Sequence, residues 1–181
     1  DLNGDGKPDL AVTNYGSNKV SVLLNTTAPG ATTPSFAAEE AFAAGTRPAS
    51  LSLGDLNGDG KPDLVTNSGP ATVSVLLNTT PWLTTFGLAA KQDFTTGPDP
   101  FPVSLGDLNG DGKSDLVVAN QGSDTVSVLL NTTVPGATTP SFTAKQDFAA
   151  GTRPYSVALG DLNGDGKSDL VVANHLSNTV S

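Results

Sequence analysis

The chain has 181 residues, of which 36% are hydrophobic and 6% aromatic, and it carries a formal charge of −9. Its 20 Gly and 13 Pro favour short strands joined by tight turns, and no stretch reaches the roughly 20 apolar residues of a membrane-spanning helix. The acidic balance without a basic stripe argues against nucleic acid as a partner, and the absence of Cys excludes disulfides.

A ten-residue motif, Asp-Leu-Asn-Gly-Asp-Gly-Lys-(Pro/Ser)-Asp-Leu, occurs four times, at residues 1–10, 55–64, 107–116 and 161–170. The copies begin 54, 52 and 54 residues apart. A period near 50 built of strand-like segments is typical of β-propeller blades. The sequence therefore predicts an all-β chain of blades with four antiparallel strands each. We expect a partial blade over 1–48, blades over 49–100 and 101–154, and a partial blade over 155–181.

These ranges amount to about three and a half blades. Closed propellers have about four to eight, so we expect this chain to form part of a larger propeller or assembly. The sequence begins inside a motif, without an initiating Met. We interpret it as an excerpt from a longer or processed chain.

The third repeat shows the expected strands most fully. A first strand over 103–105 leads into the motif, and the apolar run 116–119 suits a strand buried on both faces. The β-branched segment 125–130 places Val126 and Val128 on one face, and the alternating segment 142–148 completes the blade. The next blade begins with a strand over 156–159. Polar, Gly-containing segments such as 120–123 supply the turns.

Each motif carries the oxygen ligands of a hard cation. Calcium takes about six to eight oxygens at about 2.3–2.6 Å, and the side chains at motif positions 1, 3 and 5 can converge if the backbone curls around one point. Gly at position 6 permits the positive φ that such a curl requires. Lys at position 7 is expected to offer its carbonyl while its ammonium points to solvent. Asp at position 9 closes the site.

Other loop types fit less well. An EF-hand needs an acidic residue at position 12, where this chain has Val12, Thr66, Val118 and Val172. The same test excludes dockerin-like loops. The ligand set suits neither magnesium, which retains its waters, nor zinc, which prefers His or Cys. An Asx-rich turn without metal is the remaining alternative, and the fourfold recurrence of the ligand positions favours calcium.

The acidity of the chain is concentrated in these motifs. Three Asp in each of four loops account for 12 of the 18 acidic residues. Four bound divalent cations would reduce the formal charge from −9 to −1. We therefore expect up to four Ca²⁺ ions, one per loop.

The segment Val-Ser-Leu-Gly-Asp-Leu-Asn-Gly-Asp-Gly-Lys-Ser-Asp-Leu-Val-Val-Ala at 103–119 closely resembles the FG-GAP (VCBS-type) repeat. That repeat builds the β-propeller head of integrin α-subunits and of many bacterial extracellular proteins. The Phe-Gly pair that names the family is replaced here by segments such as Arg-Pro-Ala-Ser at 47–50. The resemblance implies a calcium loop between the first and second strands of each blade. The implied ligands are Asp1, Asn3, Asp5 and Asp9; Asp55, Asn57, Asp59 and Asp63; Asp107, Asn109, Asp111 and Asp115; Asp161, Asn163, Asp165 and Asp169; and the carbonyls of Lys7, Lys61, Lys113 and Lys167.

Antiparallel blades place the loops between strands 2 and 3, and those between blades, on the rim opposite the calcium loops. That rim holds residues that differ between repeats, as a recognition surface would: Tyr15, Arg47, Asp99, Gln121, Arg153, Tyr155 and His175. Ordinary variation of exposed loops is the alternative. Because His175 is the only His and Cys is absent, we expect no enzyme.

Two further features allow alternatives. Asn-Thr-Thr at 25–27, 78–80 and 131–133 matches the N-glycosylation pattern but also suits a turn after a strand. The single Trp, Trp82, lies in the one 3–4 loop of different length, where it either fills a gap or stacks on a sugar.

The sequence thus predicts a non-catalytic, calcium-stabilised adhesion or scaffold module. A carbohydrate-binding lectin propeller and an ancillary domain of a secreted hydrolase are the alternatives. The expected partners are the remainder of its own propeller or other copies of the chain, and an extracellular protein or glycan. The resemblance implies a secreted or cell-surface protein of bacterial type, without membrane insertion.

Overall fold

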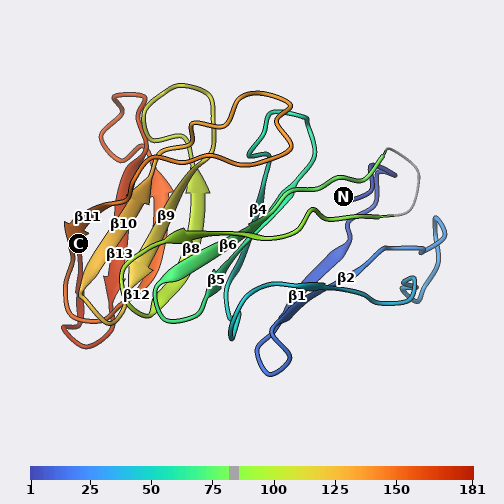
Figure 1. The fold of residues 1–181 in the computed structure, drawn as a ribbon, viewed down its shortest axis with the longest axis horizontal. Helices are drawn as coiled ribbons and strands as arrows, with labels where there is room; N and C mark the ends of the chain where they lie inside the picture. Colours follow the sequence, from blue (N-terminus) through green and yellow to red (C-terminus); the bar gives the residue numbers. More distant parts are fainter. Residues whose placement is uncertain (82–85) are drawn as a thin grey trace.

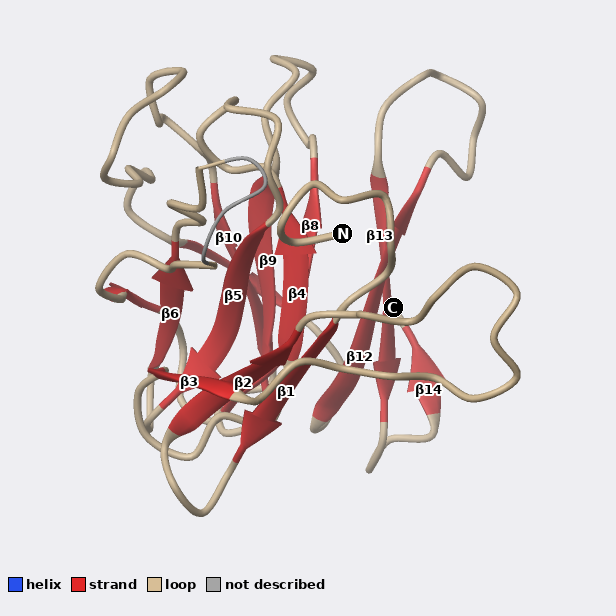
Figure 2. Cartoon of the chain, turned by 90° about the vertical axis from the view of Figure 1, so that its right-hand side faces the viewer, coloured by secondary structure: helices blue, strands red, loops and turns tan. Residues whose placement is uncertain are grey.

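The computed structural model describes residues 1–81 and 86–181, so Trp82 lies outside the described residues. Within these residues the chain forms fourteen strands and no helix, as expected for an all-β chain (Figures 1 and 2). No helix of the described residues is long and apolar enough to cross a membrane.

The strands form four antiparallel sheets, each of which follows chain order (Figure 1). The first sheet contains β1 (Leu10–Asn14), β2 (Lys19–Leu23) and β3 (Glu40–Ala43), and the second contains β4 (Leu51–Gly54), β5 (Asp63–Ser68), β6 (Thr72–Leu76) and β7 (Gln92–Thr95). The third contains β8 (Pro100–Gly106), β9 (Asp115–Asn120), β10 (Thr125–Leu129) and β11 (Gln146–Ala149), and the fourth contains β12 (Pro154–Gly160), β13 (Asp169–Asn174) and β14 (Thr179–Val180).

The third and fourth sheets begin at Pro100 and Pro154, one residue before the blade boundaries expected at 101 and 155. The first strands of neighbouring sheets lie against one another, because β8 contacts both β4 and β12. Side-chain hydroxyls join them: Ser104 Oγ donates a hydrogen bond of 3.0 Å to the Val157 carbonyl oxygen. The two chain ends lie at opposite sides of the array in Figure 1.

The hydrophobic core lies between the sheets. One cluster joins the first and second sheets through Val20 and Leu64, a second joins the second and third through Val73 and Leu116, and a third joins the third and fourth sheets. Every residue of β5 and β9 is buried, which confirms that the apolar run 116–119 is covered on both faces. Stacking of sheets therefore supplies the burial that a single thin sheet lacks.

The predicted first residue of the fourth strand in the third blade was wrong. The segment 142–148 was expected to be one strand, but β11 begins at Gln146 and Phe142 forms only an isolated bridge with Asn131. The first and second sheets have the same gap, between the Phe36 bridge and β3 and between the Leu88 bridge and β7, so the short fourth strand is a feature of the repeat. The Phe142 ring instead meets Phe94 of the second sheet edge to face, with ring centroids 4.9 Å apart.

Candidate functional site

Three of the four copies of the repeated motif lie between the first and second strands of a sheet, as the resemblance implies, and the first copy precedes β1. The Asp55 loop joins β4 to β5, the Asp107 loop joins β8 to β9, and the Asp161 loop joins β12 to β13. The predicted curl is present: Gly60 and Gly112 both have φ of +81°. The backbone of each loop therefore turns back on itself around its first residue.

The Asp at position 1 organises each loop. In the third loop, Asp107 Oδ1 accepts the N–H groups of Gly110 and Asp111 at 2.7 and 3.2 Å, and Oδ2 accepts the Gly112 N–H at 2.8 Å. The other three loops repeat this pattern with distances between 2.7 and 3.2 Å. Four separate segments thus adopt one geometry, because the same carboxylate collects the same three backbone donors.

The Asp at position 9 ties the loop to the end of the third strand. Asp63 is fully buried, and its two carboxylate oxygens accept the N–H groups of Leu56 and Asn78 at 2.8 and 2.7 Å. Asp115 is also fully buried and makes the equivalent bonds to Leu108 and Asn131, both at 2.8 Å. These carboxylates therefore hold two distant backbone segments together.

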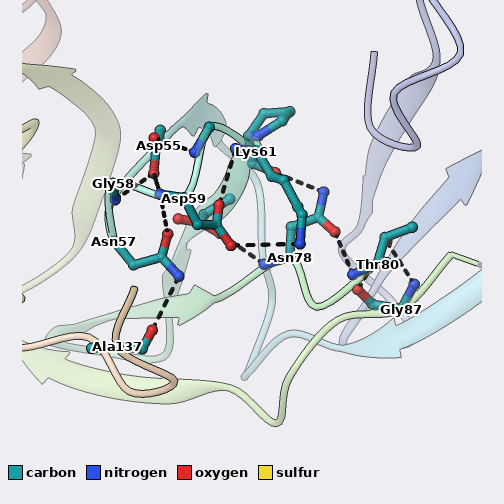
Figure 3. A network of polar contacts seen from close by, with 12 residues as sticks. Asp55, Asn57, Gly58, Asp59, Lys61, Asn78, Thr80, Gly87 and Ala137 are labelled. Atoms are coloured by element: carbon teal, nitrogen blue, oxygen red, sulfur yellow. Dashed lines mark hydrogen bonds and ion pairs between the residues drawn. The ribbon is translucent and has the colours of Figure 1, made fainter. Parts of the chain in front are cut away.

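The Asn at position 3 is oriented from both sides in the second loop. Asn57 Oδ1 accepts the Asp59 N–H at 3.2 Å, while its Nδ2 donates to the Ala137 carbonyl oxygen at 3.0 Å (Figure 3). Ala137 belongs to the 3–4 loop of the next sheet. The neighbouring blade thus keeps the amide oxygen of Asn57 turned into its own loop.

In two loops the Lys ammonium lies near an Asp carboxylate of its own loop. Lys61 Nζ lies 3.6 Å from Asp59 Oδ2, and Lys7 Nζ lies 3.8 Å from Asp5 Oδ2. Three acidic side chains in one short loop attract a cation, and the Lys of the same motif is close enough to form an ion pair with one of them. Because these pairs are partly exposed, each contributes little to stability.

The surroundings of the loop carboxylates shift their pKa values in opposite directions. Burial raises the pKa of Asp63 to about 6, and the neighbouring charges of Asp59 and Asp55 add to this rise, although hydrogen bonds from two N–H groups oppose it. The N–H of Gly112, with those of other loop residues, lowers the pKa of Asp107. The pKa of Asp161 is lowered in the same way, chiefly by the hydrogen bond from the Gly166 N–H. A divalent cation would relieve the repulsion around Asp63.

The donor set fits calcium in its chemistry. Each loop offers carboxylate, carboxamide and carbonyl oxygens and neither nitrogen nor sulfur ligands, and a carboxylate oxygen that accepts one N–H retains a lone pair for a metal. However, no three His, Cys, Asp or Glu side chains converge into a metal-binding group within residues 1–81 and 86–181. The loops are thus closed by N–H···O bonds, and the ligand sphere would have to tighten around an incoming ion.

A second candidate region lies at the opposite ends of the strands. Six of the seven residues expected there line one cavity of about 760 Å³: Tyr15, Arg47, Asp99, Gln121, Arg153 and Tyr155. The seventh, His175, lies beside it, with its ring 5.9 Å from the Tyr155 ring. The rim that faces away from the Asp-rich loops is therefore concave, and the residues that differ between repeats lie in it.

Sequence reasoning missed Phe101, which lines the cavity and whose ring lies 5.3 Å from that of Tyr155. Its place in the repeat could have revealed it, since Phe101 follows Asp99 by two residues as Tyr155 follows Arg153. The roles of Asn78 and Asn131 were also understated. Both are 2% exposed with their amide groups bonded to backbone, so they serve as turn residues buried within the fold.

Comparison with known proteins agrees with the repeated architecture. A family model described as an FG-GAP-like repeat matches three overlapping ranges, 1–66, 55–118 and 107–172. A comparison with curated proteins gave no match.

Proposed function

Because the chain belongs to the FG-GAP-like repeat family, we propose that it is a calcium-stabilised, non-catalytic module of a secreted or cell-surface protein, and that it serves in adhesion or as an extracellular scaffold. The observation that carries this proposal is the identical organisation of four loops around their first Asp. Each loop brings three carboxylates and one carboxamide into a segment of nine residues. Such a concentration of acid is costly unless a cation occupies it.

Calcium would act mainly on stability. Extracellular modules bind calcium with dissociation constants of about 10⁻⁴–10⁻³ M, so each site would add about 0.4–1.4 kcal/mol at roughly millimolar calcium. Four sites would contribute about 2–6 kcal/mol, against a typical total of about 5–15 kcal/mol for a domain. Bound calcium would therefore supply a large part of the folding free energy of this chain, which has no disulfides.

A further blade, from its own propeller or from another copy of the chain, is the partner we propose for the first sheet. Leu10 and Val12 of β1 are each 46% exposed, whereas the residues at the same repeat positions in the third sheet, Leu116 and Val118, are fully buried against the preceding sheet. The exposed face thus has the chemistry of a surface that packs against another blade. Mass measurement in solution, with and without calcium, tests this proposal. A folded monomer under both conditions contradicts it.

Calcium titration followed by calorimetry tests the metal proposal directly. We expect up to four ions per chain, and the variant Asp107→Asn should lower that number by one. Lys145→Gln, which changes a charge far from the loop in sequence, is the matched control and should leave the number unchanged. A stoichiometry of zero in the parent chain would refute the calcium role.

A further inference from the structure

The chain contains only two arginines, Arg47 and Arg153, and both line the cavity on the rim opposite the calcium loops. None of the described lysines lines it. Arg differs from Lys in presenting a planar fork that binds carboxylates through two parallel hydrogen bonds. The placement of both arginines in one concave region therefore indicates recognition of an anion with planar geometry.

The backbone holds both arginines in a strained conformation. Arg47 and Arg153 have φ of +52° and +56°, in the left-handed region that side chains other than Gly rarely adopt. Their N–H groups donate to Asn18 Oδ1 at 2.8 Å and Asp124 Oδ1 at 2.7 Å. The Arg153 carbonyl oxygen also accepts the His175 N–H at 3.0 Å. These bonds fix the point from which each guanidinium extends.

Neither guanidinium group forms an ion pair with a carboxylate among the described residues. All four ion pairs found among the described residues use Lys, so neither arginine is neutralised by a carboxylate there. The Arg47 guanidinium lies over the Tyr15 ring, 5.8 Å from its centroid. Arg153 Nε donates to Gln121 Oε1 at 3.3 Å, which leaves its terminal nitrogens for a ligand. Aromatic and amide contacts thus orient the charges without cancelling them.

Aromatic rings supply the apolar part of the cavity. Tyr15 and Tyr155 are 56% and 52% exposed, and the Tyr155 ring packs edge to face with Phe101. Large rings exposed together in one cavity are more typical of a ligand surface than of an ordinary loop. The cavity volume of about 760 Å³ lies within the range of small-ligand sites, about 300–1,000 Å³.

We propose that this cavity binds an acidic sugar, such as a uronic acid residue of an anionic glycan. The carboxylate would pair with the Arg forks, and the apolar C–H face of the sugar ring would rest on the tyrosines. Asp99, in the same cavity, can accept but not donate hydrogen bonds when ionised. It therefore suits hydroxyl groups, which an acidic sugar carries and an acidic peptide side chain lacks. This inference names a ligand for the proposed adhesion role and rests on that role for its extracellular setting.

Isothermal titration with trigalacturonate, at about millimolar calcium and physiological salt, tests the proposal. Neutral galactotriose and triglutamate serve as comparison ligands. We expect trigalacturonate to bind, Arg153→Gln and Arg47→Gln each to weaken it by about tenfold, and Arg153→Lys to weaken it despite the retained charge. Lys19→Gln removes the same charge from an exposed site and should change affinity by less than about twofold.

Several results would overturn the inference. These are the absence of trigalacturonate binding, equal binding of galactotriose, preference for triglutamate, or unchanged affinity in both Arg→Gln variants. Melting temperature in calcium shows whether each variant is folded. The calcium role is read from a different measurement, the loss of stability on chelation. Trigalacturonate binding without an effect of chelation would defeat only the calcium proposal, and the reverse result would defeat only this one.

Discussion

The side-chain Nδ2 of Asn78 donates a hydrogen bond of 2.8 Å to the carbonyl oxygen of Leu2, 76 residues earlier in the chain. The third repeat contains the same bond, from Asn131 to the Leu56 carbonyl oxygen at 2.9 Å. The backbone N–H of each of these Asn residues also donates a hydrogen bond to the carboxylate of the Asp at position 9 of its own repeat. The Asp-rich loop of one blade is therefore joined to the third strand of the next through a single Asn.

Replacing Asn131 by Ala should destabilise the protein by about 2–4 kcal/mol, because it removes buried side-chain bonds to three backbone groups. Asn25→Ala is the matched control. Asn25 occupies the same repeat position and bonds to Pro8 within its own repeat, so its loss should cost about 0.5–1.5 kcal/mol. Urea denaturation measures both values. Equal losses would show that the link between blades contributes nothing.

Removing calcium should lower the melting temperature. The proposed contribution of about 2–6 kcal/mol corresponds to a shift of roughly 4–24 °C for a chain of this size. Calorimetry before and after addition of EDTA measures the shift. Excess calcium should restore the original value and magnesium should not, since magnesium keeps its waters. An unchanged melting temperature in EDTA speaks against metal in these loops.

Gly97 should not tolerate a side chain. A Cβ at this position would lie 2.5 Å from Cγ of Asn120, which is fully buried. Gly97→Ala should therefore cost about 1–3 kcal/mol through overpacking. At Gly16, an added Cβ would meet nothing within 4 Å, so Gly16→Ala should stay within about 0.5 kcal/mol of the parent. Chemical denaturation compares the two, and similar costs would disprove the close approach.

Asp147 should make stability depend on pH in the acidic range. Partial burial acts to raise its pKa, but hydrogen bonds from Lys145 and Ser127 outweigh burial and lower the pKa below its ordinary value. A carboxylate with a lowered folded-state pKa stabilises the fold above its unfolded pKa of about 3.9, and this contribution is lost as pH falls through the folded pKa.

The difference in unfolding free energy between the parent and Asp147→Asn should thus be largest near neutral pH and shrink toward pH 3 and below. Denaturation of the metal-free proteins across this range measures it. Asp93→Asn should behave alike, because burial and hydrogen bonds from Lys91 and Ser74 have the same net effect there. A difference that grows with acidification would reverse the sign and contradict the assigned contacts.

Much of the fold could be predicted from local spacing. The four motifs, the positive φ of Gly112 and the buried strand β9 follow from residues within one short segment, because tight turns and alternating burial depend on near neighbours. The candidate calcium loops belong to the same class. Their hydrogen bonds connect residues at most seven apart, apart from those that the third strand and the next blade supply.

What the sequence by itself determined was therefore the unit: a strand, an acidic loop, and a second strand buried on both faces. The tertiary structure decided the contacts between units. It brought Phe142 against Phe94, set Asn131 against Leu56, and gathered Arg47 and Arg153 around one cavity. These pairs lie about 50 to more than 100 residues apart in the chain. Their proximity depends on how whole sheets stack, which no short stretch of sequence encodes.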